Sequence, residues 1–526
     1  MRNNRKNTFE ILLAVYLVCY FIVSLKTLTL FPFVHSDEAW LSGLTRNMMD
    51  TWNLGITESF FDLKPRYPHG IKTLFHLLQM PVISLLGYEI FNLRLLSLLF
   101  GCLCLLAFYK LLDRLFKTSA PLWLPLLGTL LLSLNIQFIY ASHMARQEIV
   151  LLFFLLLCLL ALQREHYLLA GLVTGLSIGI HPNSFLIGVM GVVLLIPVWR
   201  EKKWKPLLGY TGITAGFALF FVSLSLFFDR DFFRHYFEYG NSEFDVGAPL
   251  TGKLAGFPLY LIKIWHQISG TYYLPDIRLE MVLFLAALGG GIFLLLAGSQ
   301  KEKADAAFLL KGLVGLVLGM ILIGRYNQTS IIFLFPLLLT LLIYVLFTGI
   351  GRLSFQKKGK DKGVLLVLSL VILLTGISSC HNILPWTGSS YGDYLKEISK
   401  AVSPEDKVLA NLNSDYYFRN GKLLDYRNLS YLKDSSLSVE EYLKKSKIEY
   451  IILSDELDLI YAKRPNWNII YGNLRYLDEL HAYTRDHCTL IHSFTNNTYG
   501  TRISPYINSD TDFTVKIFKV KDFSGQ

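Results

Sequence analysis

The run His35-Ser36-Asp37-Glu38-Ala39-Trp40 follows the first long apolar stretch of the chain, near residues 9–33. It places two adjacent carboxylates at the end of a segment that is long enough to cross a membrane. Charged groups beside hydrocarbon are costly, so the pair indicates a functional site. Such a carboxylate suits a general base that takes a proton from an acceptor hydroxyl. The alternative is a favourable interaction with the dipole of the helix that follows.

The composition is that of a polytopic membrane protein. Of the 526 residues, 53% are hydrophobic and 17% are charged, whereas soluble domains carry about one quarter charged residues. The formal net charge is +10. The basic excess lies among the apolar stretches and not in the polar tail that follows His381. It therefore argues against nucleic-acid binding and for a signal that orients the spans.

Apolar stretches predict about eleven transmembrane helices, since one span needs about 20 apolar residues. They are placed near residues 9–33, 91–112, 119–140, 147–163, 167–181, 184–199, 206–228, 279–298, 306–323, 329–350 and 363–380. The segment 69–87 contains Lys72, His76 and Gln79 and is a poor span. We predict that it is a helix lying in the outer interface of the membrane.

Clusters of lysine and arginine predict the orientation of these spans. They precede the first span and follow the second, fourth, sixth, eighth and tenth, as Arg200 and Lys202 follow the sixth. The positive-inside rule then puts the N-terminus in the cytoplasm and the polar segments outside. The outer loops are residues 34–90 and the long loop 229–278. The predicted location is the plasma membrane, which the chain crosses many times.

The composition changes after residue 380 and predicts two domains. A transmembrane domain covers residues 1–380, and an extracytoplasmic soluble α/β domain covers residues 381–526. In the tail, Ser438 to Glu441 resembles a capping box that opens a helix ending near Lys447. Strands are predicted at 406–412, 448–453 and 513–517. The role of this domain stays open.

Signals for metals and cofactors are weak. The six cysteines include no CxxC pair and no His/Cys cluster with metal-ligand spacing. Asp37 and Glu38 are the one pair considered for a divalent cation, and two acids alone do not establish a metal. The sequence therefore names no required cofactor. Whether Cys380 and Cys488 form a disulfide also stays open.

Polar groups at the outer ends of spans suit a lipid phosphate. A leaving phosphate needs fixed cations, and the planar fork of arginine matches phosphate oxygens. The candidate substrate-binding residues are Lys64, Arg66, His69, Arg146, Glu148, His181, Asn183, Arg325 and Tyr326. Structural alternatives stay open, namely headgroup-facing charge in the first loop, an Arg146–Glu148 ion pair, and simple turns between spans.

Several motifs, in their order and spacing, resemble one family of membrane transferases. They are Asp37-Glu38-Ala39, Pro68-His69, the run from Phe91 to Gly101 with Arg94, Ala145-Arg146-Gln147-Glu148, and the glycine-spaced stretch from Gly171 to Gly179. These resemble the dolichyl-phosphate-mannose protein mannosyltransferases and the bacterial aminoarabinose transferases of lipid A, which share the GT-C architecture. The resemblance covers roughly residues 8–350.

The resemblance implies a glycosyltransferase. A hexose or pentose would move with inversion from a polyprenyl-phosphate carrier to an extracytoplasmic lipid, glycan or protein. Asp37 would be the general base, Glu38 would support catalysis by orienting a partner or a metal, and the cavity would be lined by Arg146 and Glu148. The sugar, the acceptor and the oligomeric state stay open. The alternative is a transporter or flippase with an outer binding domain, which would favour ionisable residues near mid-membrane.

Overall fold

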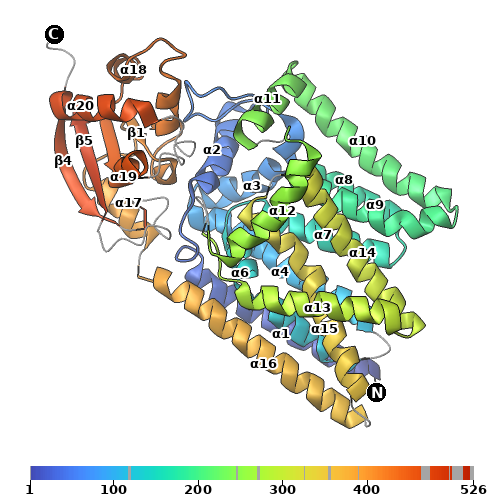
Figure 1. Cartoon of the computed structure of the whole chain (residues 1–526). Helices are drawn as coiled ribbons and strands as arrows, with labels where there is room; N and C mark the ends of the chain where they lie inside the picture. The colour runs from blue at the N-terminus through green and yellow to red at the C-terminus, as the bar shows by residue number, and fades with distance from the viewer. Residues whose placement is uncertain are drawn as a thin grey trace.

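The computed structural model describes residues 2–116, 120–244, 247–268, 273–324, 326–353, 357–388, 390–463, 474–496, 498–499 and 513–521. Long apolar helices form a bundle, and a small α/β domain made from the tail lies at one end of it (Figure 1). The predicted fold class, a polytopic helical membrane domain followed by an α/β domain, is confirmed.

Every predicted span position holds an apolar helix or a helix pair. Among the described residues, eight helices are long and apolar enough to cross a membrane, counting the short 3-10 segments before α9 and α15. They are α1 (Arg2–Thr27), α4 (Ile90–Phe116), α9 (Phe185–Arg200), α10 (Trp204–Phe228), α13 (Arg278–Ala297), α14 (Gln300–Ile323), α15 (Phe335–Leu353) and α16 (Lys357–Ile383). Two shorter apolar helices, α7 (Glu148–Gln163) and α8 (Tyr167–Ile178), precede α9.

The predicted span 119–140 is not one straight helix. It consists of α5 (Leu124–Ser133) and α6 (Ile136–His143), which are bent by 65° relative to each other. The Asn135 side chain accepts hydrogen bonds from the backbone N–H groups of Gln137 and Phe138, at 3.0 and 3.3 Å. The bend occurs there because this side chain caps the start of a new helix.

Four further helices belong to the two long loops. The first loop contains α2 (Ser36–Thr51) and α3 (Thr73–Leu86), which follows the 3-10 turn η1 (Gly70–Lys72). The second loop contains α11 (Phe232–Phe244) and α12 (Leu250–Trp265). Figure 1 shows α2 and α11 near the end of the bundle where the tail domain lies. The helix predicted over residues 69–87 is confirmed as α3.

The tail forms a five-stranded mixed sheet in the order β2-β1-β3-β5-β4. Its strands are β1 (Val408–Ala410), β2 (Leu423–Asp425), β3 (Tyr450–Ser454), β4 (Cys488–Thr495) and β5 (Thr514–Val520). Strand β1 pairs in parallel with β2 and β3, whereas β5 is antiparallel to β3 and β4. Its helices are α17 (Tyr391–Ser399), α18 (Val439–Lys445), α19 (Asp455–Lys463) and α20 (Leu477–His487).

The three predicted strands correspond to β1, β3 and β5, and the capping box at Ser438 opens α18 as expected. Two strands were missed. Strand β2 has three residues, which is too short for a periodic signal, and β4 is largely exposed. Cys380 and Cys488 are both free thiols, as are the other four cysteines.

Glycines allow α8 and α10 to approach each other closely. A Cβ atom at Gly171 would lie 2.7 Å from the backbone oxygen of Tyr210, and one at Gly175 would lie 2.5 Å from the Phe217 ring. Both positions therefore require glycine for this packing. The contact matters for the site described next because α10 leads directly into Asp229 and α11.

Candidate active site

A cavity of about 610 Å³ lies between α2, the first loop, α11 and the turns that precede α7 and α9. Its size is that of a small-molecule site. It brings together candidate residues that are far apart in the sequence, namely Asp37, Lys64, Arg66, His69, Arg146, His181 and Asn183. Glu38, Glu148 and Tyr326 are not among the lining residues, and Arg325 lies outside the described residues.

Asp37 lies in the first turn of α2 and is held by Arg146. Its Oδ2 atom is 2.8 Å from Nη1 of Arg146, and its side chain remains 23% exposed. On the other side, Arg146 binds Glu148, with Nη2 2.9 Å from Oε1 and Nε 3.2 Å from Oε2. Thr329 donates a further hydrogen bond of 3.0 Å to Glu148 Oε1. The buried arginine therefore lies between two carboxylates, one of which faces the cavity.

Glu38 points away from the cavity and is completely buried. Nη2 of Arg94 is 2.6 Å from its Oε1 atom, and Nε of Arg94 is 2.8 Å from Oε2. The backbone N–H groups of His35 and Ala145 donate hydrogen bonds of 2.9 and 2.7 Å to the same carboxylate. Of the two acids that the sequence singled out as catalytic, Asp37 therefore lines the cavity and Glu38 does not. Glu38 instead joins α2 to α4 and to the segment before α7.

Arg94 extends this buried connection to the end of the first span. It donates hydrogen bonds to the backbone oxygens of Leu28 and Pro32 at 2.8 Å and to that of Phe33 at 3.3 Å. The charged pair is thus surrounded by hydrogen bonds, as a buried ion pair must be. The arginine in the run Phe91–Gly101 therefore connects the end of α1 to the start of α2 and does not line the cavity.

The acidic pair does not fit a divalent cation. Both oxygens of Glu38 bind N–H donors, and Asp37 binds a guanidinium. A cation there would have to replace these donors, and it would meet the positive charge of Arg146. Over the described residues, no group of three or more His, Cys, Asp and Glu residues could hold a metal ion.

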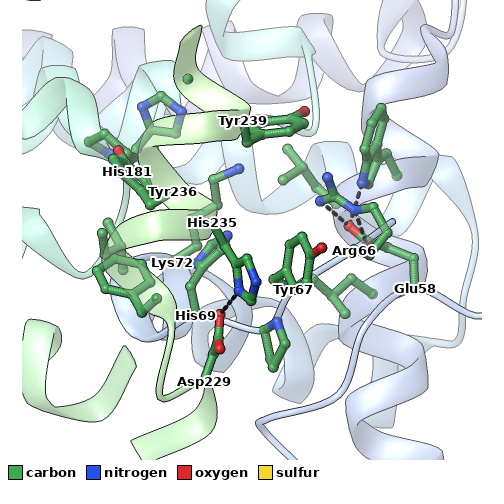
Figure 2. Close-up of a pocket in the computed structure, with 18 of the residues that line it drawn as sticks. Glu58, Arg66, Tyr67, His69, Lys72, His181, Asp229, His235, Tyr236 and Tyr239 are labelled. Atoms are coloured by element: carbon green, nitrogen blue, oxygen red, sulfur yellow. Dashed lines mark hydrogen bonds and ion pairs between the residues drawn. The ribbon is translucent and has the colours of Figure 1, made fainter. Parts of the chain in front are cut away.

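Arg66 forms a two-point ion pair with Glu58 on one wall of the cavity (Figure 2). Its Nε and Nη2 atoms lie 2.9 and 2.8 Å from the two oxygens of Glu58. Burial alone would raise the pKa of Glu58, but the charge of Arg66 and its hydrogen bonds lower that pKa to about 2. Arg66, a candidate phosphate ligand from the sequence, is therefore paired with a carboxylate of the cavity wall.

His69 is held in its neutral form. Burial lowers the pKa of this side chain to about 3, and the charges of Lys72 and Arg66 act in the same direction. Its Nδ1 atom is buried and has no hydrogen-bond partner among the described residues. His69 therefore lines the cavity as an uncharged side chain, whereas Lys64 and Lys72 bring positive charge to it.

His181 and Asn183 line the cavity at the turn between α8 and α9. Nδ1 of His181 accepts a hydrogen bond of 3.1 Å from the backbone N–H of Asn183 and so caps the 3-10 turn η2 (Pro182–Ser184). Tyr326 has another environment, because its hydroxyl donates to the backbone oxygen of Lys253 and its ring stacks on Tyr260. It connects α12 to the segment before α15.

Sequence reasoning missed several lining residues. Lys72 was considered only as evidence against a span, yet it lines the cavity and lies between His181 and Tyr67 in the view of Figure 2. From α11, His235 stacks on Tyr67 with ring centroids 3.5 Å apart, and its Nδ1 is 2.6 Å from Asp229 Oδ2. Lys72 could have been identified from the sequence as a basic residue at the start of an interfacial helix. The contacts of α11 could not, because no local sequence pattern indicates them.

A further missed residue comes from the tail domain. Arg427 lines the cavity and lies over the rings of Trp40 and Phe61, with centroid distances of 4.5 and 5.0 Å. It follows β2 in the 3-10 segment η6 (Tyr426–Tyr431). Only the folded chain brings this segment to α2, so no sequence pattern pointed to it.

Comparisons with known proteins identify the fold. No family model and no curated protein matches the chain. Among solved structures, ArnT from Cupriavidus metallidurans bound to undecaprenyl phosphate matches with a TM-score of 0.56 and 12% identity, over 97% of this chain and 98% of that chain. The archaeal oligosaccharyltransferase AglB from Archaeoglobus fulgidus, in complex with an inhibitory peptide and a dolichol-phosphate, matches with a TM-score of 0.54 and 10% identity, over 91% and 73%.

These matches cover nearly the whole chain, including the bundle, the two long loops and the tail domain. They agree with the resemblance that the motifs around Asp37, Arg94 and Arg146 predicted. The chain has the GT-C membrane fold of ArnT and AglB.

Proposed function

We propose that this protein is a membrane glycosyltransferase that moves a sugar from a polyprenyl-phosphate carrier to an acceptor outside the cytoplasm. The observation that carries the proposal is the cavity in which a partly exposed Asp37, fixed by Arg146, faces the same space as Lys64 and Lys72. A base and cations in one cavity are what this transfer needs. The structural neighbours, bound to undecaprenyl phosphate and to a dolichol-phosphate, support the same class of donor.

In the proposed reaction, an acceptor hydroxyl attacks the anomeric carbon of the donor from the face opposite the phosphate. A new bond forms between the hydroxyl oxygen and this carbon, and the bond between the carbon and the phosphate oxygen breaks. Asp37 takes the hydroxyl proton, and the polyprenyl phosphate leaves with the bonding electron pair. The charge on that phosphate would be stabilised by Lys64 and Lys72. One displacement of this kind inverts the anomeric configuration.

The buried acids would act through their neighbours. Glu148 holds Arg146 from the side opposite Asp37 and so fixes the orientation of the proposed base. Glu38 fixes the first turn of α2 through Arg94 and Ala145. Small errors in the position of a reacting group cost large factors in rate, so both acids would be positioning residues.

We also propose the topology that the basic clusters predict, with the N-terminus in the cytoplasm and the tail domain outside. The domain division then falls near residue 380, and α16 ends shortly after it, at Ile383. The carrier-linked donor would reach the cavity by lateral diffusion among the membrane lipids. The sequence-based alternative, a transporter or flippase, is not favoured by any contact among the described residues.

A transfer assay tests the proposal. Purified protein in detergent is incubated with a panel of polyprenyl-phosphate sugars, both hexoses and pentoses, and with lipid, glycan and protein extracts of the cell envelope. The proposal expects release of polyprenyl phosphate together with a glycosylated acceptor for one member of the panel. If the protein instead moves an intact carrier lipid across vesicle membranes without consuming the sugar linkage, the flippase alternative is correct.

A further inference from the structure

The tail domain holds the part of the first loop that leads into Lys64. The backbone oxygen of Phe60 accepts two hydrogen bonds from the tail, one from the backbone N–H of Asp425 at 3.2 Å and one from Nδ2 of Asn428 at 2.9 Å. Asn428 is completely buried. The loop is therefore attached to the end of β2 and to η6 by contacts that solvent does not weaken.

The same asparagine binds three successive residues of the loop. Its Oδ1 atom accepts hydrogen bonds of 3.2 Å from the backbone N–H groups of Asp62, Leu63 and Lys64. Only an oxygen can accept all three, and the amide nitrogen then faces the Phe60 carbonyl, so the orientation of this amide is determined by its partners. Convergence of three donors on one atom fixes the direction of the backbone at Lys64.

A second contact of the tail reinforces this attachment. The Asp62 carboxylate accepts a hydrogen bond of 2.8 Å from the hydroxyl of Tyr442, which lies in α18, and one of 3.2 Å from Ser446. The side chain and the backbone of this loop segment are thus both held by the tail domain. The position of the segment then depends on how the tail is seated against the bundle.

Lys64 reaches the cavity beside another tail residue. Its Nζ atom lies 5.2 Å from the ring of Trp40 and 5.6 Å from that of Phe61, the two rings that Arg427 also covers. Cations over aromatic faces are attracted to them and are held in place. Trp40 belongs to α2, as Asp37 does. Lys64 and the tail residue Arg427 therefore both contact the helix that carries the proposed base.

We propose that Asn428 is a positioning residue of the transfer site, through which the tail domain sets the place of Lys64 relative to Asp37. This inference rests on the proposed function, in which Lys64 binds the phosphate of the donor. It gives the tail domain a defined role, which is to form one side of the donor site. Loss of Asn428 then weakens phosphate binding by displacing Lys64.

A double-mutant cycle tests this role. Dissociation constants for undecaprenyl phosphate are measured in detergent for the wild type, Asn428→Ala, Lys64→Ala and the double variant. We expect each single variant to weaken binding by about 10-fold, as for loss of one hydrogen bond to a charged group. The double variant is expected to bind no more weakly than Lys64→Ala, because both changes remove the same interaction.

Two further variants separate positioning from stability. Asn428→Asp keeps the acceptor oxygen for the three N–H groups and is expected to retain part of the affinity, and it replaces Asn428→Ala in the cycle if the latter does not fold. Asp415→Asn breaks the buried pair with Arg46 at the same domain interface, where Asp415 Oδ2 is 2.9 Å from Arg46 Nη2. Asp415→Asn is expected to lower the Tm and to leave the dissociation constant unchanged.

The outcomes distinguish this inference from the function on which it rests. If the wild type binds undecaprenyl phosphate and the effects of Asn428→Ala and Lys64→Ala multiply in the double variant, Asn428 acts independently of Lys64 and the inference is wrong. If Asp415→Asn weakens binding as strongly as Asn428→Ala, the effect is one of general stability and the inference is wrong. If the wild type shows no binding, the proposed donor class is wrong as well.

Discussion

Arg94 binds Glu38 through two hydrogen bonds of 2.6 and 2.8 Å at a site closed to solvent, while the residue before Glu38 faces the cavity. Adjacent residues of a helix point in directions about 100° apart, so the two acids of one doublet enter different environments. One is available to a substrate and the other belongs to the framework of the bundle.

Replacing Glu38 by glutamine should destabilise the protein. The variant keeps the shape of the side chain but leaves the charge of Arg94 buried without a counter-charge, which costs about 3–5 kcal/mol. The Tm in detergent should therefore fall much further for Glu38→Gln than for Asp37→Asn, whose side chain is partly exposed. Equal values of Tm for the two variants would contradict the structural role of Glu38.

Replacing Lys72 by glutamine should weaken binding of undecaprenyl phosphate by about 10-fold, because a charge-assisted contact with phosphate is lost. Isothermal titration calorimetry at two salt concentrations measures the dissociation constant. The affinity of the variant should also depend less on salt. The matched control is Lys205→Gln, an exposed lysine at the start of α10 that does not line the cavity. A phosphate site elsewhere is indicated if both variants bind as the wild type does.

Acid should destabilise the wild type partly through His69. The folded-state pKa of His69 is about 3 and its ordinary value is 6.5, so the unfolded chain binds the extra proton between these values. Stability is therefore lost as the pH falls below about 6.5. The variant His69→Gln should show a shallower fall in Tm between pH 7 and pH 5. In free energy of unfolding, the two proteins should differ in slope by at most about 1.4 kcal/mol per pH unit. Parallel curves would show that His69 titrates normally in the folded protein.

Cysteine labelling should place the tail domain and the first loop in one compartment. Asn53 and Lys433 are exposed positions of the loop and the tail, and Lys205 is an exposed position next to a basic cluster. In a chain whose exposed Cys19 and Cys380 are replaced by serine, Asn53→Cys and Lys433→Cys should react with an impermeant maleimide in intact cells. Lys205→Cys should react only after permeabilisation. Labelling of all three in intact cells would refute the topology.

The sequence predicted the bundle well because long apolar runs and basic clusters are local signals that the membrane enforces. Among the candidate site residues that it named, Asp37, Lys64, Arg146 and His181 line one cavity. The bend at Asn135 was missed because one capping side chain interrupts an otherwise continuous apolar run.

The failures within the site concern side-chain direction and distant contacts. Glu38 could not be separated from Asp37 without the position of Arg94, which lies on another helix. Arg66 forms its ion pair with Glu58, and the backbone of Lys64 is held by Asn428 in the tail. Such contacts follow from tertiary packing, and no periodicity in the chain reports them.

Asp37 is the residue on which the proposed transfer depends most, since it is the base that takes the acceptor proton. The most direct measurement is the single-turnover rate of Asp37→Asn with a donor that the wild type uses, together with its affinity for undecaprenyl phosphate and its Tm. The account predicts a rate lowered by about 100- to 10,000-fold, the usual contribution of a general base, with affinity and Tm close to the wild type. A rate within a few fold of the wild type would contradict it.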